Sequence, residues 1–292
     1  MQNLNTPSPA EEPSKLSRRD AVTMMTLAPL GFSALSGTAS AADSSKPHAG
    51  KVILITGSSR GMGAAYARRF GRDGFNVTVN YLQNRDLAAQ VARDIEQSGS
   101  RAISVQADVS DPKAVARLFD ETERAFGGVD VVINNAGIMR LAPFATMKDE
   151  DFTRLMDVNL KGGFNVLREA AKRVRDGGRI ISMSSSITQL RTATYGPYAA
   201  SKAALEIFSS CLAKELRGRQ ISVNALAPGV VATSLFLDVP GRTEAEVQQF
   251  AARTPHGRIG QPEDLAAVMA ALVSADGHWI NGQTVFANGG LI

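Results

Sequence analysis

A glycine-rich turn directly after an apolar run is the feature that most constrains the fold of this 292-residue chain. Residues 51–56 (Lys-Val-Ile-Leu-Ile-Thr) are mostly apolar and β-branched, which is typical of a buried parallel strand. The turn Gly57-Ser-Ser-Arg-Gly61-Met-Gly63 follows at once, and a helical pattern continues over Ala64–Arg72. Glycines in such a turn let backbone N–H groups approach a pyrophosphate. The pattern therefore predicts a nucleotide-binding strand–turn–helix unit, although the turn alone is equally compatible with a purely structural role.

The rest of the chain alternates between strand and helix patterns. Residues 51–292 are expected to form a single Rossmann-type domain, an α/β doubly wound parallel sheet of about seven strands with helices on both faces. Further strands are predicted at Phe75–Tyr81, Arg101–Gln106, Val129–Asn134, Gly178–Ser184, Ile221–Leu226 and Thr284–Phe286. Helical patterns lie near residues 84–98, 111–126, 148–176, 197–217 and 262–274. The longest irregular connection runs from Val230 to Gly260 and is expected to form a lid over a binding site.

Tyr198 and Lys202 form a candidate acid–base pair. On a helix their four-residue spacing puts the phenol and the ammonium group on one face, one turn apart. A free tyrosine has a pKa near ~10, and a nearby lysine charge favours the phenolate and lowers that pKa. The same spacing also occurs on ordinary surface helices, so the pair indicates a catalytic site only together with the motifs around it.

Three motifs in this order resemble those of the short-chain dehydrogenase/reductase family. They are Thr-Gly-x-x-x-Gly-x-Gly at residues 56–63, Asn-Asn-Ala-Gly at residues 134–137, and Tyr198-x-x-x-Lys202. The resemblance extends from about Lys51 to the C-terminus. It points to the branch that contains NADP-dependent carbonyl reductases and 3-oxoacyl-carrier-protein reductases.

The resemblance implies a catalytic set of four residues. Asn159, in Asp-Val-Asn-Leu-Lys-Gly, matches the asparagine that anchors a proton-relay water. Ser185 matches the serine that polarises the substrate carbonyl. Tyr198 matches the residue that exchanges the proton. Lys202 matches the lysine that lowers the pKa of this tyrosine and binds the nicotinamide ribose.

Charge around the glycine turn predicts NADP(H) as the cofactor. NAD-selective sites usually place a carboxylate after the second strand, where it holds the ribose 2′-hydroxyl. Here that strand runs into Asn80-Tyr81-Leu-Gln-Asn-Arg85, which has no carboxylate. Arg60 can pair with a 2′-phosphate, and an exposed surface arginine is the alternative interpretation. By resemblance, Asp108 binds the adenine and the segment after Pro228 holds the nicotinamide carboxamide. The full set of expected cofactor contacts is Gly57, Ser59, Arg60, Gly61, Met62, Gly63, Asn80, Tyr81, Asp108, Val109, Asn135, Ala136, Gly137, Tyr198, Lys202, Pro228, Gly229, Val231 and Thr233.

The function implied by the resemblance is NADPH-dependent reduction of a small or medium ketone or aldehyde by direct hydride transfer, with no metal. An alcohol or sugar dehydrogenase working oxidatively is the main alternative, followed by a non-catalytic NADP-binding regulator or an assembly protein. The family also implies a homotetramer or homodimer. The expected walls of the substrate pocket are Met139, Arg140, Leu141, Leu190, Tyr195 and Phe236.

The first 41 residues follow a different pattern, which predicts a twin-arginine export signal. Arg18-Arg19 precede a mostly uncharged stretch that ends at Ala42, and Ala39-Ser40-Ala41 offers a small-residue cleavage site. The stretch is too short and too rich in Gly, Ser and Thr for a membrane span. Residues 42–50 then form a linker. We therefore expect a periplasmic enzyme. The alternative is a cytoplasmic protein with a disordered tail and a chance arginine pair.

Composition agrees with this assignment. The net charge of +4 is spread along the chain, so nucleic-acid binding has little support. The single cysteine, Cys211, cannot form an intramolecular disulfide and is expected to be buried. The three histidines lack metal-ligand spacing, and we predict no metal site.

Overall fold

The computed structural model describes residues 46–292, so the predicted export signal and part of the linker lie outside the described residues. Seven parallel strands form one sheet in the order β3-β2-β1-β4-β5-β6-β7. The strands are β1 (Val52–Ile55), β2 (Asn76–Tyr81), β3 (Ala102–Gln106), β4 (Val129–Asn134), β5 (Val174–Met183), β6 (Ser222–Pro228) and β7 (Thr284–Ala287). The direction of winding reverses beside β1. This confirms the predicted doubly wound sheet.

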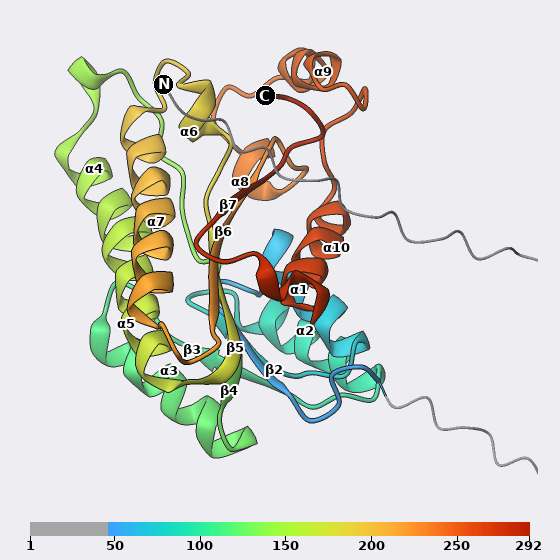
Figure 1. The fold of residues 1–292 in the computed structure, drawn as a ribbon. Helices are drawn as coiled ribbons and strands as arrows, with labels where there is room; N and C mark the ends of the chain where they lie inside the picture. Colours follow the sequence, from blue (N-terminus) through green and yellow to red (C-terminus); the bar gives the residue numbers. More distant parts are fainter. Residues whose placement is uncertain (1–45) are drawn as a thin grey trace, which may run out of the picture. The chain divides into compact units, whose positions relative to one another are not determined.

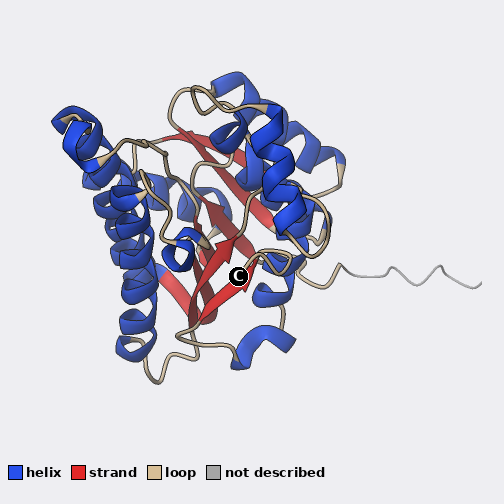
Figure 2. Ribbon diagram, turned by 90° about the horizontal axis from the view of Figure 1, so that it is seen from above, coloured by secondary structure: helices blue, strands red, loops and turns tan. Residues whose placement is uncertain are grey.

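Helices cover both faces of the sheet (Figures 1 and 2). One layer, on the right in Figure 1, contains α1 (Gly61–Arg72), α2 (Arg85–Gln97) and α10 (Pro262–Val273). The layer on the left contains α3 (Pro112–Phe126), α5 (Gly163–Arg173) and α7 (Gly196–Glu215). Each layer has its own apolar core against the sheet, with Phe70 and Phe75 in the first and Phe119 in the second. Burial of each such side chain contributes about 1.5–3 kcal/mol to the free energy of unfolding. Because β1 is buried on both faces, its sequence is an unbroken apolar run.

Local signals fix several helix boundaries. The Asp111 side chain accepts a backbone hydrogen bond at the start of α3, and Gly127 ends that helix with φ of 83°, a left-handed conformation that favours glycine. Thr243 and Glu246 form a reciprocal capping box at the start of α9 (Glu244–Arg253).

The structure corrects three predictions. Residues 148–176 do not form one helix: α4 (Asp149–Met156) leads into the π-helical turn η2 (Asp157–Gly162), then into α5, and β5 begins at Val174. The apolar period of the sequence cannot separate these segments because all of them keep one face toward the core. The connection Val230–Gly260 is not irregular, since it contains α8 (Ser234–Leu237) and α9. Cys211 is exposed on α7.

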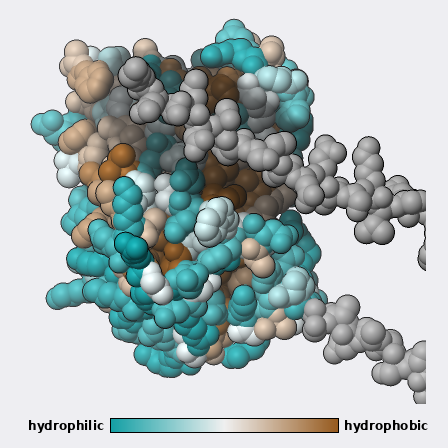
Figure 3. All heavy atoms as spheres, viewed as in Figure 1, coloured by the Kyte–Doolittle hydropathy of each residue, from teal (hydrophilic) through white to brown (hydrophobic). Residues whose placement is uncertain are grey.

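Hydrophilic residues cover most of the surface visible in Figure 3, while strongly apolar residues lie mainly in its recesses. Within residues 46–292 no helix has the length and apolar content that a bilayer crossing needs. Three short elements complete the described chain: η1 (Phe144–Thr146), α6 (Ile187–Leu190) and η3 (Asp276–Trp279).

Candidate active site

The end of β4 holds the glycine turn between β1 and α1. Thr56 Oγ1 accepts hydrogen bonds from the backbone N–H groups of Asn135 and Ala136 at 2.9 and 3.0 Å. In return, Asn135 Nδ2 donates to the carbonyl oxygens of Thr56 and Gly57 at 2.8 and 3.0 Å. Gly63 must be glycine, because an added Cβ would lie 2.5 Å from the Gly57 carbonyl oxygen. The turn is thus fixed at the carboxyl edge of the sheet, with the N-terminus of a 12-residue helix directly after it.

The segment after β6 lies against the same turn. Gly57 and Gly61 have φ of 61° and 56°, a backbone conformation that glycine adopts without strain. A Cβ added at Gly61 would lie 3.5 Å from Thr233 Cγ2. Val231 pairs with Gly260 in an isolated bridge, which holds this segment in place. Two of the predicted cofactor-binding segments, far apart in the sequence, are therefore neighbours.

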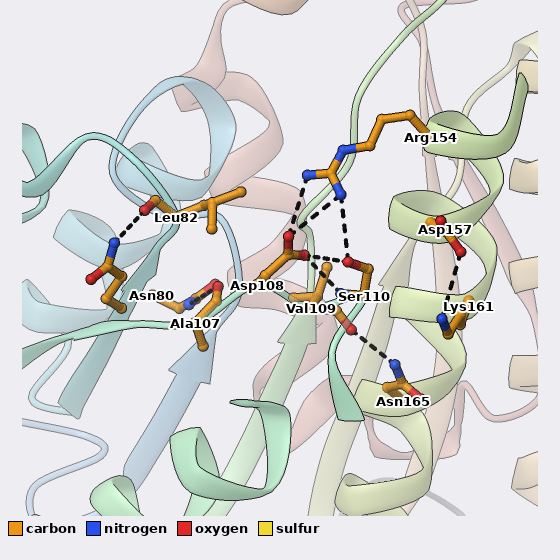
Figure 4. Close-up of polar contacts among 11 residues, drawn as sticks. Asn80, Leu82, Ala107, Asp108, Val109, Ser110, Arg154, Asp157, Lys161 and Asn165 are labelled. Atoms are coloured by element: carbon orange, nitrogen blue, oxygen red, sulfur yellow. Dashed lines mark hydrogen bonds and ion pairs between the residues drawn. The ribbon is translucent and has the colours of Figure 1, made fainter. Parts of the chain in front are cut away.

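Asn80 and Arg60 play different parts in this region. The Asn80 side chain is buried, and its Oδ1 accepts a hydrogen bond from the Gly57 backbone N–H at 3.0 Å. Its Nδ2 donates to the carbonyl oxygen of Val105 at 3.2 Å and to that of Ala107 at 3.1 Å, the second of which is drawn in Figure 4. Asn80 therefore shapes the turn from beneath. Arg60 is exposed at the start of α1, and among the described residues no ion pair involves its guanidinium.

Asp108 lies just beyond β3 in a polar cluster (Figure 4). Its Oδ1 accepts hydrogen bonds from the backbone N–H and the hydroxyl of Ser110 at 2.9 and 2.7 Å, and Arg154 Nη2 of α4 lies 3.3 Å from Oδ2. Burial opposes ionisation of Asp108, but the Ser110 hydrogen bonds and the Arg154 charge outweigh it, so the pKa of Asp108 lies below its ordinary value. An ionised carboxylate can accept further hydrogen bonds, such as one from an adenine amino group.

The four predicted catalytic residues meet at the carboxyl ends of β4 and β5. Asn159 lies in η2, where its Oδ1 accepts from the Ile138 backbone N–H at 2.8 Å and its Nδ2 donates to the Ile138 carbonyl at 2.9 Å. A Cβ added at Gly137 would lie 3.3 Å from Asn159 Oδ1 and 3.4 Å from Lys202 Nζ. Asn159 and Lys202 therefore converge on a backbone position that carries no side chain.

A carboxylate of α7, which the sequence did not single out, holds the turn that carries Ser185. Ser184 Oγ donates to Glu206 Oε1 at 2.5 Å, and Thr188 Oγ1 donates to the same oxygen at 3.0 Å. Ser184 and Thr188 flank Ser185 in the sequence, so Glu206 ties both sides of the turn to the helix that carries Tyr198.

Burial controls the ionisation of Tyr198 and Lys202. It raises the pKa of Tyr198 to about 12, while a hydrogen bond with Ser185 acts in the opposite direction and Tyr195 adds to the rise. Burial also lowers the pKa of Lys202 to about 8. Lys202 Nζ donates to the Met183 carbonyl at 2.8 Å and lies 5.8 Å from the centre of the Tyr198 ring. The net pKa of Tyr198 is therefore raised and not lowered as the sequence predicted, because desolvation outweighs the effects that favour the phenolate.

A cavity opens beside Ser185 and Tyr198. It holds about 740 Å³ of space outside protein atoms, part of it open to solvent, and none of the described residues that line it carries a charged side chain. Four of the predicted pocket walls line it: Met139, Leu190, Tyr195 and Phe236. Arg140 and Leu141, also predicted as walls, are not among its lining residues, and the half-exposed Arg140 side chain pairs with Asp151 at 3.3 Å. Ile187 and Leu291 are further walls, and Leu235 and Phe250 come from the connection that was predicted to form the lid.

Comparison with known proteins decides the family. A family model described as enoyl-(acyl carrier protein) reductase matches residues 57–292. A short-chain type dehydrogenase/reductase of Picea abies is 43% identical over 253 residues, which cover 83% of this chain and 93% of that protein. The chain belongs to the short-chain dehydrogenase/reductase family. It is thus an oxidoreductase, and the predicted family and fold are confirmed.

Other members of the short-chain dehydrogenase/reductase family extend this comparison. An Arabidopsis thaliana protein named NADPH-dependent aldehyde reductase 2, chloroplastic, is 42% identical over 84% of this chain and 94% of its own length. The crystal structure of a short-chain dehydrogenase from Burkholderia cenocepacia J2315 in complex with NADP is also similar, with a TM-score of 0.79 and 36% identity. The match covers 84% of this chain and 99% of that one.

In this dehydrogenase/reductase, Lys202 should make stability depend on pH. Its pKa is about 8 in the folded protein against an ordinary value of 10.5. Between these values the unfolded chain holds a proton that the folded protein lacks, so the free energy of unfolding rises as the pH rises. The full shift corresponds to about 3 kcal/mol.

Denaturant unfolding of the wild type and of Lys202→Met, compared from about pH 7.5 to 10.5, measures this effect. The variant has no titrating group at this position, so the wild type should gain stability relative to it as the pH rises. A stability difference that stays constant over this range would contradict the prediction.

Proposed function

We propose that this protein uses NADPH to reduce a small or medium, uncharged ketone or aldehyde, with Tyr198 as the proton donor. The observation that carries the proposal is the position of Ser185 and Tyr198 in the wall of an apolar cavity, with Lys202 buried beside the tyrosine. The name of the Arabidopsis relative supports the reaction class. The apolar walls favour a carbonyl compound of this kind over a sugar.

The residues around the glycine turn, at the carboxyl edge of the sheet, fit the cofactor NADP(H). The glycine turn packs closely against the end of β4 and is followed directly by the N-terminus of α1, where backbone N–H groups can meet a pyrophosphate. The exposed guanidinium of Arg60 can meet a 2′-phosphate. Asp108 offers an ionised acceptor for the adenine. When bound, NADPH would supply the hydride for the reduction.

The protein's own residues handle the proton and the developing charge. The Ser185 hydroxyl donates a hydrogen bond to the carbonyl oxygen and stabilises negative charge as the carbonyl carbon is reduced. The Tyr198 phenol then transfers its proton to that oxygen, which completes the alcohol. The raised pKa suits this direction because it keeps the phenol protonated before the reaction. At neutral pH Lys202 is still largely an ammonium ion, and its charge stabilises the phenolate that remains.

Replacing Tyr198 with phenylalanine tests the proton donor. Turnover should fall by about 10²–10⁴-fold, the usual contribution of a general acid. The dissociation constant for NADPH, measured by fluorescence titration, should stay within a few-fold of the wild type. Tyr195→Phe is the matched control and should keep most of the turnover. If Tyr198→Phe retained substantial activity, Tyr198 would not be the proton donor.

Replacing Arg60 with serine tests the recognition of the 2′-phosphate. The loss of a charge-assisted contact should lower kcat/KM for NADPH by about 10–100-fold and leave the value for NADH nearly unchanged. Arg72→Ser, an exposed arginine at the other end of α1, is the control. A wild-type preference for NADH, or an equal loss with both cofactors, would refute this role of Arg60.

We also propose that the protein is exported to the periplasm and assembles as a homotetramer or homodimer. Arg18-Arg19 and the small-residue site at Ala39-Ser40-Ala41 support export. Exposed Phe164 on α5 and Ile207 on α7 support assembly, because these helices otherwise present apolar side chains to water.

Cell fractionation of the natural sequence and of Arg18→Lys/Arg19→Lys tests export. The natural sequence should yield a shortened periplasmic protein, whereas the variant should stay in the cytoplasm at full length. Full-length cytoplasmic protein from the natural sequence would end the export proposal. An exported enzyme would also need to retain and recycle its cofactor.

A further inference from the structure

The lid over the cavity consists of α8, α9 and the turn between them. It contributes two aromatic walls, Phe236 from α8 and Phe250 from α9. Their rings meet edge to face with centroids 5.5 Å apart. The two lid helices therefore share one aromatic contact on the side that faces the cavity.

Arg242, in the turn between the two helices, is a buried cation whose side chain is only 9% exposed. Its guanidinium carbon lies 4.4 Å from the centre of the Phe236 ring and 5.8 Å from that of Phe250. Its Nη2 donates a hydrogen bond to the Tyr195 hydroxyl at 3.2 Å. Three walls of the cavity, two from the lid and one from the start of α7, therefore meet at one guanidinium.

An ion pair does not explain why an arginine is buried here. The partner carboxylate, Glu246, is 3.7 Å away and about half exposed, so the pair contributes little. Within the described residues Arg242 Nε is buried without a hydrogen-bond partner, which adds to the cost of removing the charge from water. The two aromatic faces and the Tyr195 hydrogen bond are what offset this cost. An apolar residue could fill the same space without this desolvation cost, but it could not contact Phe236 and Phe250 and also donate a hydrogen bond to Tyr195.

Tyr195 connects Arg242 and the two lid rings to Tyr198, the proposed proton donor. It precedes the first turn of α7, and its ring packs edge to face with that of Tyr198 at a centroid distance of 6.4 Å. The contact chain from the lid to the proton donor therefore has only two steps, Arg242 to Tyr195 and Tyr195 to Tyr198.

We propose that Arg242 is a positioning residue that fastens the aromatic lid to the catalytic helix and so sets the apolar end of the substrate site. Arg242 does not itself line the cavity, so it shapes the site through Phe236, Phe250 and Tyr195. The substrate class that fits is an uncharged carbonyl compound with a bulky apolar or aromatic group packed beneath the lid. This substrate class rests on the proposed reductase function, whereas the fastening of the lid does not.

The kinetic experiment compares Arg242→Met and Arg242→Lys with Arg253→Met, a change at an exposed arginine of α9. At saturating NADPH, Arg242→Met should raise KM for a bulky aromatic ketone about tenfold, with kcat changed less than threefold. KM for a small aliphatic aldehyde and the NADPH dissociation constant should change little. Arg242→Lys should be intermediate, since it keeps the charge but loses the planar group. In Arg242→Met, the further change Tyr195→Phe should have little effect, because the shared hydrogen bond is already gone.

Hydrogen–deuterium exchange tests the fastening without any turnover. Peptides that cover residues 234–253 should exchange faster in Arg242→Met than in the wild type or Arg253→Met, while peptides of β1 and α1 should not change. If exchange of the lid and KM both stay at wild-type values, the proposal is wrong. It is also wrong if Arg242→Met impairs only substrates that carry a carboxylate, since Arg242 would then bind an anion directly. Faster lid exchange in a protein that reduces no carbonyl compound would retain the fastening and reject the reductase function.

Discussion

The reciprocal hydrogen bonding between Thr56 and Asn135 is the interaction on which the rest of the site depends. It joins the carboxyl ends of β1 and β4, the two strands between which the sheet reverses its winding. The glycine turn can approach a phosphate group only if its backbone stays in this position, and the chain toward Asn159 and Gly137 leaves from the same strand end. This short hydrogen-bond network thus sets the distance between the glycine turn and the proposed catalytic residues.

Burial then sets the chemistry of the catalytic half. Tyr198 and Lys202 are both removed from water, and desolvation moves each toward its neutral form, the tyrosine upward in pKa and the lysine downward. The site is therefore poised with a protonated phenol beside a lysine that loses its charge only slightly above neutral pH. The apolar cavity has the same character, because none of the residues described along its walls carries a charge.

Much of this arrangement could be predicted from the sequence, because it follows local patterns. Three features can be recognised from a few consecutive residues. They are the buried apolar run of β1, the glycines at positions that need a left-handed backbone, and the Tyr198–Lys202 spacing. The errors arose where tertiary packing decides. The π-helical turn at Asn159 keeps the apolar period of an α-helix, and Arg140 is adjacent in sequence to a pocket wall but does not line the cavity. The role proposed for Arg242 depends on Phe236, Phe250 and Tyr195, which only the folded lid brings together. The pKa of Tyr198 depends on how completely it is buried, which spacing does not reveal.

The burial of Tyr198 has a consequence for how its proton would be replaced after each reaction. Under the proposed mechanism each reduction leaves the site one proton short, and the Tyr198 residue is only 7% exposed to solvent. Because Tyr198 lines a cavity that is partly open to solvent, that mechanism lets the proton return through the cavity or through the neighbouring Ser185 hydroxyl and Lys202 ammonium. In that mechanism the burial that keeps the phenol protonated also makes the return of the proton a separate step of turnover.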